Sequence, residues 1–154
     1  MTGYVGPPLT RASLERLLAA EGISERAYNL YGAHDEQAFV LDQRAGGWAV
    51  FFVEQGQETG HCFFDSEAEA CLYLLQEVWR EPHNRFQLVA GPAPPEEADA
   101  AFDAWLGDQG LTRTDLREGE LKTDEVPWAY DEPFYRRYFV HRKRFRQRFG
   151  REIG

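Results

Sequence analysis

One strand-like run in the first half of the chain narrows the possible folds more than any other feature. The sequence GWAVFFVEQ, residues 47–55, is apolar on both of the faces between which a strand alternates. Such a strand is typical of the covered centre of a sheet. Shorter strand-like runs lie on either side of it, at residues 27–32, 37–43 and 61–64. We therefore predict an antiparallel meander of three or four strands between residues 27 and 64.

Three helices are predicted to pack on this sheet. The first, residues 11–21, follows Thr10, which can cap it. The second, residues 66–80, has acidic residues in its first turn and apolar residues at helical spacing after them. The third, residues 96–109, follows a proline-rich loop, and the strand, loop and helix of residues 85–110 resemble half of a ferredoxin-like unit.

The end of the chain is predicted to form a basic amphipathic helix, residues 134–150. Pro133 suits the first turn of such a helix. Aromatic residues keep to one stripe of it, and arginines fill the rest. The aromatic residues are Phe134, Tyr138, Phe145 and Phe149. At helical spacing such a stripe is typical of a face that packs inward.

A chain of 154 residues fits one domain. We expect a single α+β domain over residues 1–154. It would have an antiparallel three- to five-stranded sheet, helices packed on that sheet and a basic C-terminal helix. Residues 27–80 would supply its central meander and the helix that covers it.

Charge is divided unevenly along the chain. Residues 134–154 carry eight Arg or Lys and one acid, a net charge of +7, while residues 1–133 carry nine bases and 25 acids, a net charge of −16. Either the basic segment folds back on the acidic body, or each surface binds a charged partner. No apolar run approaches the ~18 residues of a membrane span, and the first residues lack the features of a signal peptide. We therefore expect a cytoplasmic protein that does not associate with membranes.

The residue types that carry catalysis form no recognised motif. The polar residues 34–36 are adjacent in a predicted turn and so rarely chelate one ion, and His61 and Cys62 point to opposite faces of a strand. Cys71 lies on the apolar face of a helix, where a thiolate is costly. We expect no metal, no cofactor and no catalysis. A small enzyme would require His34 and His61 to converge with a cysteine or an acid in a pocket.

An acidic surface that includes aromatic side chains is typical of a site that binds a basic protein. The expected partner-binding residues are Asp124, Glu125, Trp128, Tyr130, Asp131 and Glu132, and a second set is Asp35, Glu36 and Glu54. The plainer alternative is a solvated acidic face that keeps the protein soluble.

The basic C-terminal segment leaves a second function open, that of a nucleic-acid-associated protein. Interleaved basic and aromatic side chains can neutralise phosphates and stack on bases. The residues concerned are Arg136, Arg137, Arg142, Lys143, Arg144, Arg146 and Arg148. The competing interpretation is that the arginines pair with acids of the body. It is the favoured one, because an acidic body repels a polyanion.

Four segments follow one another in a characteristic order: YNLYG from Tyr28, EQAFVL from Glu36, GWAVFFVEQG from Gly47 and FDSEAEAC from Phe64. Over residues 27–80 this pattern resembles small α+β immunity proteins of bacterial polymorphic toxin systems. The chain has Gln55 where the pattern of that family has an arginine. The resemblance implies a cytoplasmic bacterial protein that inhibits a cognate toxin by binding it and has no catalysis of its own. The acidic composition suggests that the toxin is basic.

Overall fold

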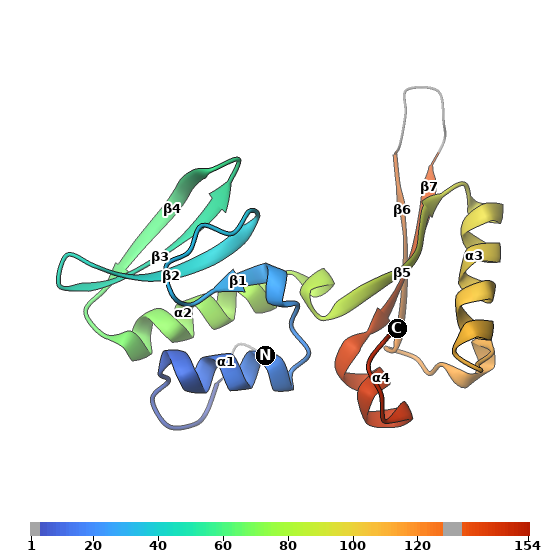
Figure 1. Cartoon of the computed structure of the whole chain (residues 1–154), viewed down its shortest axis with the longest axis horizontal. Helices are drawn as coiled ribbons and strands as arrows, with labels where there is room; N and C mark the ends of the chain where they lie inside the picture. Colours follow the sequence, from blue (N-terminus) through green and yellow to red (C-terminus); the bar gives the residue numbers. More distant parts are fainter. Residues whose placement is uncertain (1–3, 128–133) are drawn as a thin grey trace. The chain divides into compact units, whose positions relative to one another are not determined.

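The computed structural model describes residues 4–127 and 134–154. Contacts between residues divide the chain into two compact units, Met1–Arg85 (unit 1) and Phe86–Gly154 (unit 2). We predicted one domain over residues 1–154, whereas the contacts within the chain fall into these two units. Each unit has its own sheet and helices (Figure 1).

Unit 1 combines one sheet with two α-helices. Its elements are α1 (Arg11–Ala20), the 3-10 turn η1 (Glu25–Ala27), β1 (Tyr28–Asn29), β2 (Ala38–Arg44), β3 (Gly47–Glu54), β4 (Gln57–Phe64), α2 (Glu67–Arg80) and the 3-10 turn η2 (Pro82–Asn84). The sheet order is β1-β2-β3-β4, and β2, β3 and β4 form the predicted antiparallel meander. In contrast, β1 pairs with β2 in parallel, because residues 30–37 carry the chain back along the sheet before β2 begins.

The helices of unit 1 lie on one face of its sheet, with α2 against the strands and α1 beyond α2 (Figure 1). Leu41 of β2 and Val50 of β3 are buried in the same core as Leu14 and Leu18 of α1. The helical spacing predicted for residues 66–80 gives α2 its buried stripe, which consists of Ala70, Cys71, Leu74, Leu75 and Val78. Each such leucine contributes about 1.5–3 kcal/mol when it is fully buried.

The opposite face of this sheet has a smaller apolar cluster under polar side chains. Its buried members are Val40, Ala49, Phe51 and Val53. The Arg44 guanidinium lies 4.4 Å from the centroid of the Phe51 ring, and the His61 ring stacks on that ring at 5.0 Å. The prediction that β3 is apolar on both faces is therefore confirmed.

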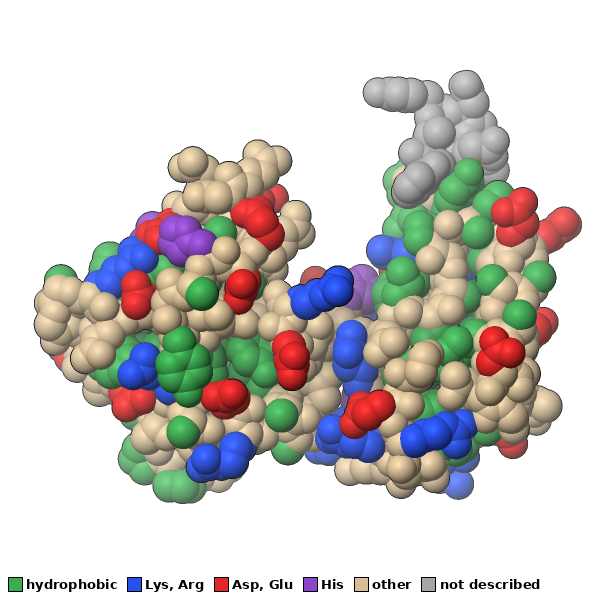
Figure 2. Space-filling model, viewed as in Figure 1, with side chains coloured by type: hydrophobic (Ala, Val, Ile, Leu, Met, Phe, Trp, Pro, Cys, Tyr) green, Lys and Arg blue, Asp and Glu red, His purple; other side chains and the backbone are tan. Residues whose placement is uncertain are grey.

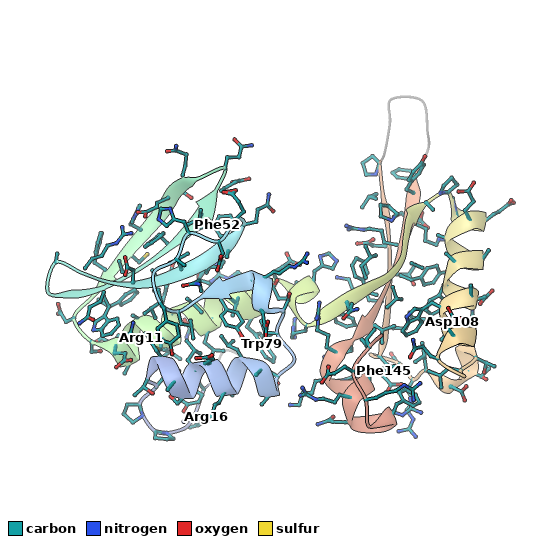
Figure 3. The ribbon with its side chains drawn as sticks, in the orientation of Figure 1. Arg11, Arg16, Phe52, Trp79, Asp108 and Phe145 are labelled. Atoms are coloured by element: carbon teal, nitrogen blue, oxygen red, sulfur yellow. The ribbon has the colours of Figure 1, made fainter. Side chains whose placement is uncertain are left out.

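Unit 2 has a three-stranded antiparallel sheet in the order β5-β7-β6. Its elements are β5 (Phe86–Ala93), α3 (Pro95–Asp108), the 3-10 turn η3 (Arg113–Asp115), β6 (Leu121–Val126), β7 (Tyr135–His141) and α4 (Arg142–Phe149). Because β5 and β6 are both antiparallel to the central β7, they run parallel to each other. This is the split arrangement of half a ferredoxin-like unit. Phe102 of α3, Tyr138 of β7 and Phe145 of α4 meet in its core. Figure 3 labels Phe145 on α4.

The predicted helix over residues 134–150 is wrong in its first half. Residues 135–141 form β7, and only residues 142–149 form a helix, α4. Tyr138, Phe139 and Val140 are consecutive and all buried, which a strand paired on both sides allows. The aromatic spacing of this segment fits a helix equally well, so pairing with β5 and β6 decides the outcome.

The class of the fold is α+β, as predicted. The prediction of one antiparallel three- to five-stranded sheet is wrong, because the chain forms one mixed four-stranded sheet and one three-stranded sheet. Strand β6 lies in a polar segment in which no strand was predicted. Among the described residues, no helix combines the length and the apolar character that crossing a membrane requires.

Candidate functional site

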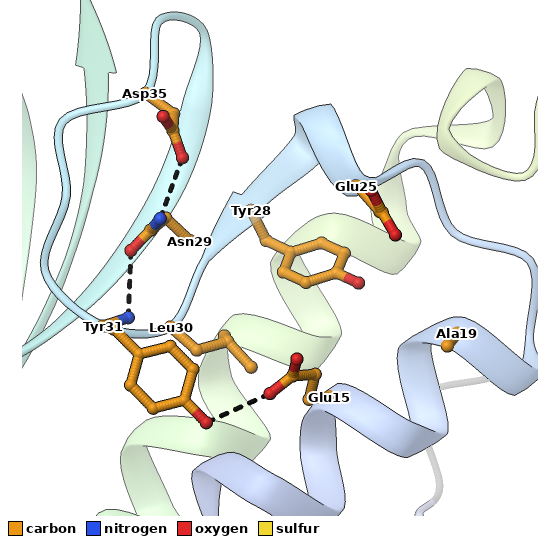
Figure 4. Close-up of a pocket in the computed structure, with 8 residues that line it drawn as sticks. All are labelled: Glu15, Ala19, Glu25, Tyr28, Asn29, Leu30, Tyr31 and Asp35. Atoms are coloured by element: carbon orange, nitrogen blue, oxygen red, sulfur yellow. Dashed lines mark hydrogen bonds between the residues drawn. The ribbon is translucent and has the colours of Figure 1, made fainter.

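A hollow of about 360 Å³ opens between α1 and β1 in unit 1. Three carboxylates and two tyrosines give it its character (Figure 4). It is lined by Glu15, Ala19, Glu25, Tyr28, Asn29, Leu30, Tyr31 and Asp35. We call this hollow the acidic tyrosine pocket.

Local hydrogen bonds hold the walls of this pocket in place. Thr10 and Ser13 form a capping box at the start of α1, the helix that carries Glu15. The Asn29 side chain accepts hydrogen bonds from the backbone N–H groups of Tyr31 and Ala33, at 2.9 and 3.0 Å. Its Nδ2 donates to Asp35 at 2.9 Å. The strand end, the loop after it and one acid are thereby tied together.

The two tyrosines are neutral hydrogen-bonding groups beside negative charge. Tyr31 donates from its hydroxyl to Glu15 at 3.0 Å, and this bond raises the pKa of Tyr31. Burial, together with the charges of Glu25 and Glu15, raises the pKa of Tyr28. Both phenols therefore stay protonated at neutral pH. The Arg11 guanidinium lies 5.0 Å from the Tyr31 ring centroid, so this ring already carries one cation on its face.

The second predicted set of partner-binding acids is distributed over different surroundings. Asp35 lines the acidic tyrosine pocket. Glu36 accepts hydrogen bonds from the backbone N–H groups of Gln55 and Gly56, at 2.7 and 2.5 Å, and so fastens the turn between β3 and β4. Glu54 is exposed at the end of β3 and does not line the pocket.

Two members of the first predicted set form ion pairs within unit 2. Asp124 bonds to Arg137 at 2.7 Å, and Glu125 bonds to Arg136 at 2.8 Å. These four residues are cross-strand neighbours in the register of β6 and β7. The rest of the set, Trp128, Tyr130, Asp131 and Glu132, lies outside the described residues.

The predicted nucleic-acid set is largely engaged in the same unit. Besides Arg136 and Arg137, Arg148 pairs with Glu120, and Arg146 lies 3.6 Å from Glu152. Burial lowers the pKa of Arg142. Lys143 also has an interaction within the molecule. Arg144 faces a hollow beside α4.

His34 and His61 converge on an acid, which is one part of what the enzyme alternative required; the other part was a pocket around them. Both Nε2 atoms bond to the Glu58 carboxylate, His61 at 2.9 Å. Arg44 donates two hydrogen bonds of 2.7 Å to the same carboxylate, and Asp42 binds Arg44 at 2.7 Å. These groups lie on the outer surface of the β2-β3-β4 sheet, and the His34 side chain is 44% exposed. Together they form an ion-pair network in which Arg44 occupies both oxygens of Glu58.

The two cysteines lie where the sequence analysis expected them, Cys71 on the apolar face of α2 and Cys62 on the opposite face of its strand from His61. Cys71 is buried on α2, and burial raises the pKa of its thiol to about 12. Cys62 points to the opposite face of β4 from His61 and bonds to the Tyr73 hydroxyl at 3.4 Å. Within residues 4–127 and 134–154, no group of three or more His, Cys, Asp or Glu side chains is arranged to hold a metal ion.

Comparison with known proteins gives no match to a family model, to a curated protein or to a solved structure. The site therefore rests on its own geometry. Sequence reasoning found Asp35 but missed Glu15, Glu25, Tyr28 and Tyr31. The run YNLYG contains both tyrosines of the pocket and is the sequence signal that could have pointed to them. The acids come from α1 and η1, and only the folded chain brings them beside that run.

Proposed function

We propose that this chain is a non-catalytic protein-binding inhibitor of the immunity type, which acts in the cytoplasm on a basic toxin. The observation that carries the proposal is the acidic tyrosine pocket, where three carboxylates surround two neutral phenols. It lies in the unit with the larger negative charge, because unit 1 has thirteen acids and six bases, a net charge of −7. The resemblance over residues 27–80 supports the same function.

The pocket chemistry suits one basic side chain of the partner. A guanidinium offers five donors in a flat fork, which carboxylates and a phenol oxygen can accept. Its flat face also stacks on a tyrosine ring, as Arg11 does on Tyr31. A hollow of about 360 Å³ is large enough for the end of an arginine side chain and the neighbouring backbone.

A direct test uses a short arginine-rich peptide as the probe. We expect the ring signals of Tyr28 and Tyr31 to shift saturably on titration, as followed by NMR. The change Glu15→Gln should weaken binding about tenfold, because it removes one charge-assisted contact. The change Glu54→Gln removes the same charge outside the pocket and serves as the matched control. Equal losses in both variants would show that the peptide senses only the general field of the protein.

A second experiment addresses the biological partner. The chain is co-expressed with the product of the neighbouring gene, and complex formation is measured by size-exclusion chromatography. We expect a complex that Glu15→Gln with Asp35→Asn weakens and that Glu54→Gln leaves intact. A complex that is indifferent to the pocket variants would move the interface to another surface of the chain.

The nucleic-acid alternative receives less support from the described contacts. Four of its seven residues pair with acids of unit 2, so a polyanion would have to compete with those acids for half of the eight bases in residues 134–154. Deletion of residues 134–154 does not test it cleanly, because this change removes β7, the central strand of unit 2.

A further inference from the structure

A second hollow, of about 250 Å³, lies in unit 2 between the turn before β6 and helix α4. Its lining is dominated by arginines, in a chain whose net charge is −9. The residues are Arg117, Glu118, Glu120, Arg144, Gln147 and Arg148. We call it the arginine pocket. Basic side chains gather over the α4 end of this unit (Figure 2).

One arginine of the pocket is fixed in place by the fold. Arg148 pairs with Glu120, whose side chain is only 4% exposed. It also donates to the backbone carbonyl of Asp115 at 2.8 Å. The Arg117 N–H in turn donates to Glu120. The Glu120 carboxylate therefore balances the charge of Arg148. The Arg148 guanidinium is held at the wall of the hollow, where its remaining N–H groups can donate.

The other two arginines have no such counter-ion. Within the part of the chain that the structure describes, neither the Arg117 nor the Arg144 side chain forms an ion pair. Arg144 lies directly over Gly119, which has a φ of +85°, and a Cβ at that position would overlap the guanidinium. The glycine thus supplies both the turn and the space that Arg144 occupies. Glu118 supplies one opposing charge at the rim, so the lining as a whole remains positive.

We propose that the arginine pocket binds a terminal phosphate, the dianion of a phosphate monoester. The Arg117 and Arg144 guanidinium groups line the same hollow and have no counter-ion among the described residues, so a dianion bound between them is attracted by both. Guanidinium forks match phosphate oxygens in pairs, and the Gln147 amide adds a neutral donor. A hollow of about 250 Å³ holds one phosphate and the first atoms of its carrier. The inference is independent of the proposed function, because it concerns the other unit.

The test titrates the full chain with inorganic phosphate and follows the arginine side-chain N–H signals by NMR. We expect saturable shifts of Arg117, Arg144 and Arg148 below about 10 mM phosphate, and none with acetate at the same ionic strength. The changes Arg117→Gln and Arg144→Gln should each weaken binding about tenfold. Arg16→Gln is the matched control, because Arg16 is an exposed arginine that belongs to unit 1 and not to the arginine pocket (labelled in Figure 3).

Two further arms separate the possible sources and guard against misfolding. Phenyl phosphate and a phosphoserine peptide distinguish a small-molecule ester from a phosphorylated chain, and tighter binding of either one identifies the source. Gly119→Ala keeps every charge but displaces Arg144, so it should also weaken binding, and circular dichroism checks that the variant is folded. Equal weakening by Arg16→Gln, or shifts that never saturate, would overturn the proposal.

Discussion

At the scale of single residues, Glu120 is a buried charge that connects several parts of unit 2. Its side chain is 4% exposed, and it accepts from both Arg148 and the Arg117 N–H. Its backbone carbonyl accepts from the His141 N–H at 2.8 Å, which joins the turn before β6 to the end of β7. Removal of one partner of such a pair leaves the other charge without compensation.

We predict that Glu120→Ala lowers the free energy of unfolding by about 3 kcal/mol. The matched control is Glu118→Ala in the same turn, where the side chain is exposed and the loss should stay below about 0.5 kcal/mol. Urea unfolding followed by tryptophan fluorescence measures both. Similar small losses in the two variants would mean that water replaces the contacts of Glu120.

Glu58 has a comparable role in unit 1, but its effect depends on pH. Hydrogen bonds from Arg44, then from His61 and His34, hold the pKa of Glu58 well below its usual range. Asp42 also faces Arg44 and keeps that side chain in place. A carboxyl group whose pKa is lowered by folding stabilises the folded state above its ordinary pKa of 4.5, and this stabilisation is lost as the pH falls.

We therefore expect Glu58→Gln to lower stability at about pH 6 and to have a smaller effect at about pH 3, where part of the stabilisation is already lost. The difference between the variant and the wild type should shrink steadily as the pH falls through the acid range. Urea unfolding at a series of pH values measures it, and Glu54→Gln, an exposed glutamate outside the cluster, is the control. A loss that is constant over this range would show that the carboxylate contacts do not set the stability.

At the scale of elements, local signals decide how well the sequence predicts the structure. Helices α1, α2 and α3 fall within a residue or two of their predicted bounds, because caps, prolines and apolar spacing all act within the helix itself. Strand β7 was missed because Tyr135–His141 carries aromatic spacing that fits a helix as well. Its strand form depends on β5 and β6, which are distant in sequence. The acidic tyrosine pocket was largely missed for the same reason.

Helix α2 offers the cleanest test of such a local signal. The Ser66 hydroxyl accepts from the Glu69 N–H at 3.2 Å and so satisfies one of the free donors of the first turn. Ser66→Ala should cost about 1 kcal/mol in the free energy of unfolding, and Ser66→Asp should cost little, since aspartate caps equally well. Thermal unfolding by circular dichroism measures both. Equal losses for alanine and aspartate would show that the cap is not the cause.

At the scale of the whole molecule, the division of charge along the chain does not follow the two units. The basic segment of residues 134–154 belongs to unit 2, which has eleven bases and thirteen acids and a net charge of −2. The ion pairs between β6 and β7 show where much of this charge is balanced. Most of the surplus of acid, −7 of the net charge of −9, therefore belongs to unit 1, the unit that contains the acidic tyrosine pocket.

This distribution predicts how salt acts on the binding of the arginine-rich peptide. Raising the ionic strength from about 20 to 300 mM shortens the screening length to several ångströms, so the field of unit 1 fades while contacts inside the pocket persist. We expect the dissociation constant to rise about tenfold over this range.

The pair Glu54→Gln with Asp65→Asn removes two charges outside the pocket and should weaken binding only at low salt. The pair Glu25→Gln with Asp35→Asn removes two charges inside it and should weaken binding at both salt concentrations. If the two pairs lose their effect together at high salt, the peptide is held by the general field of unit 1 and not by the pocket.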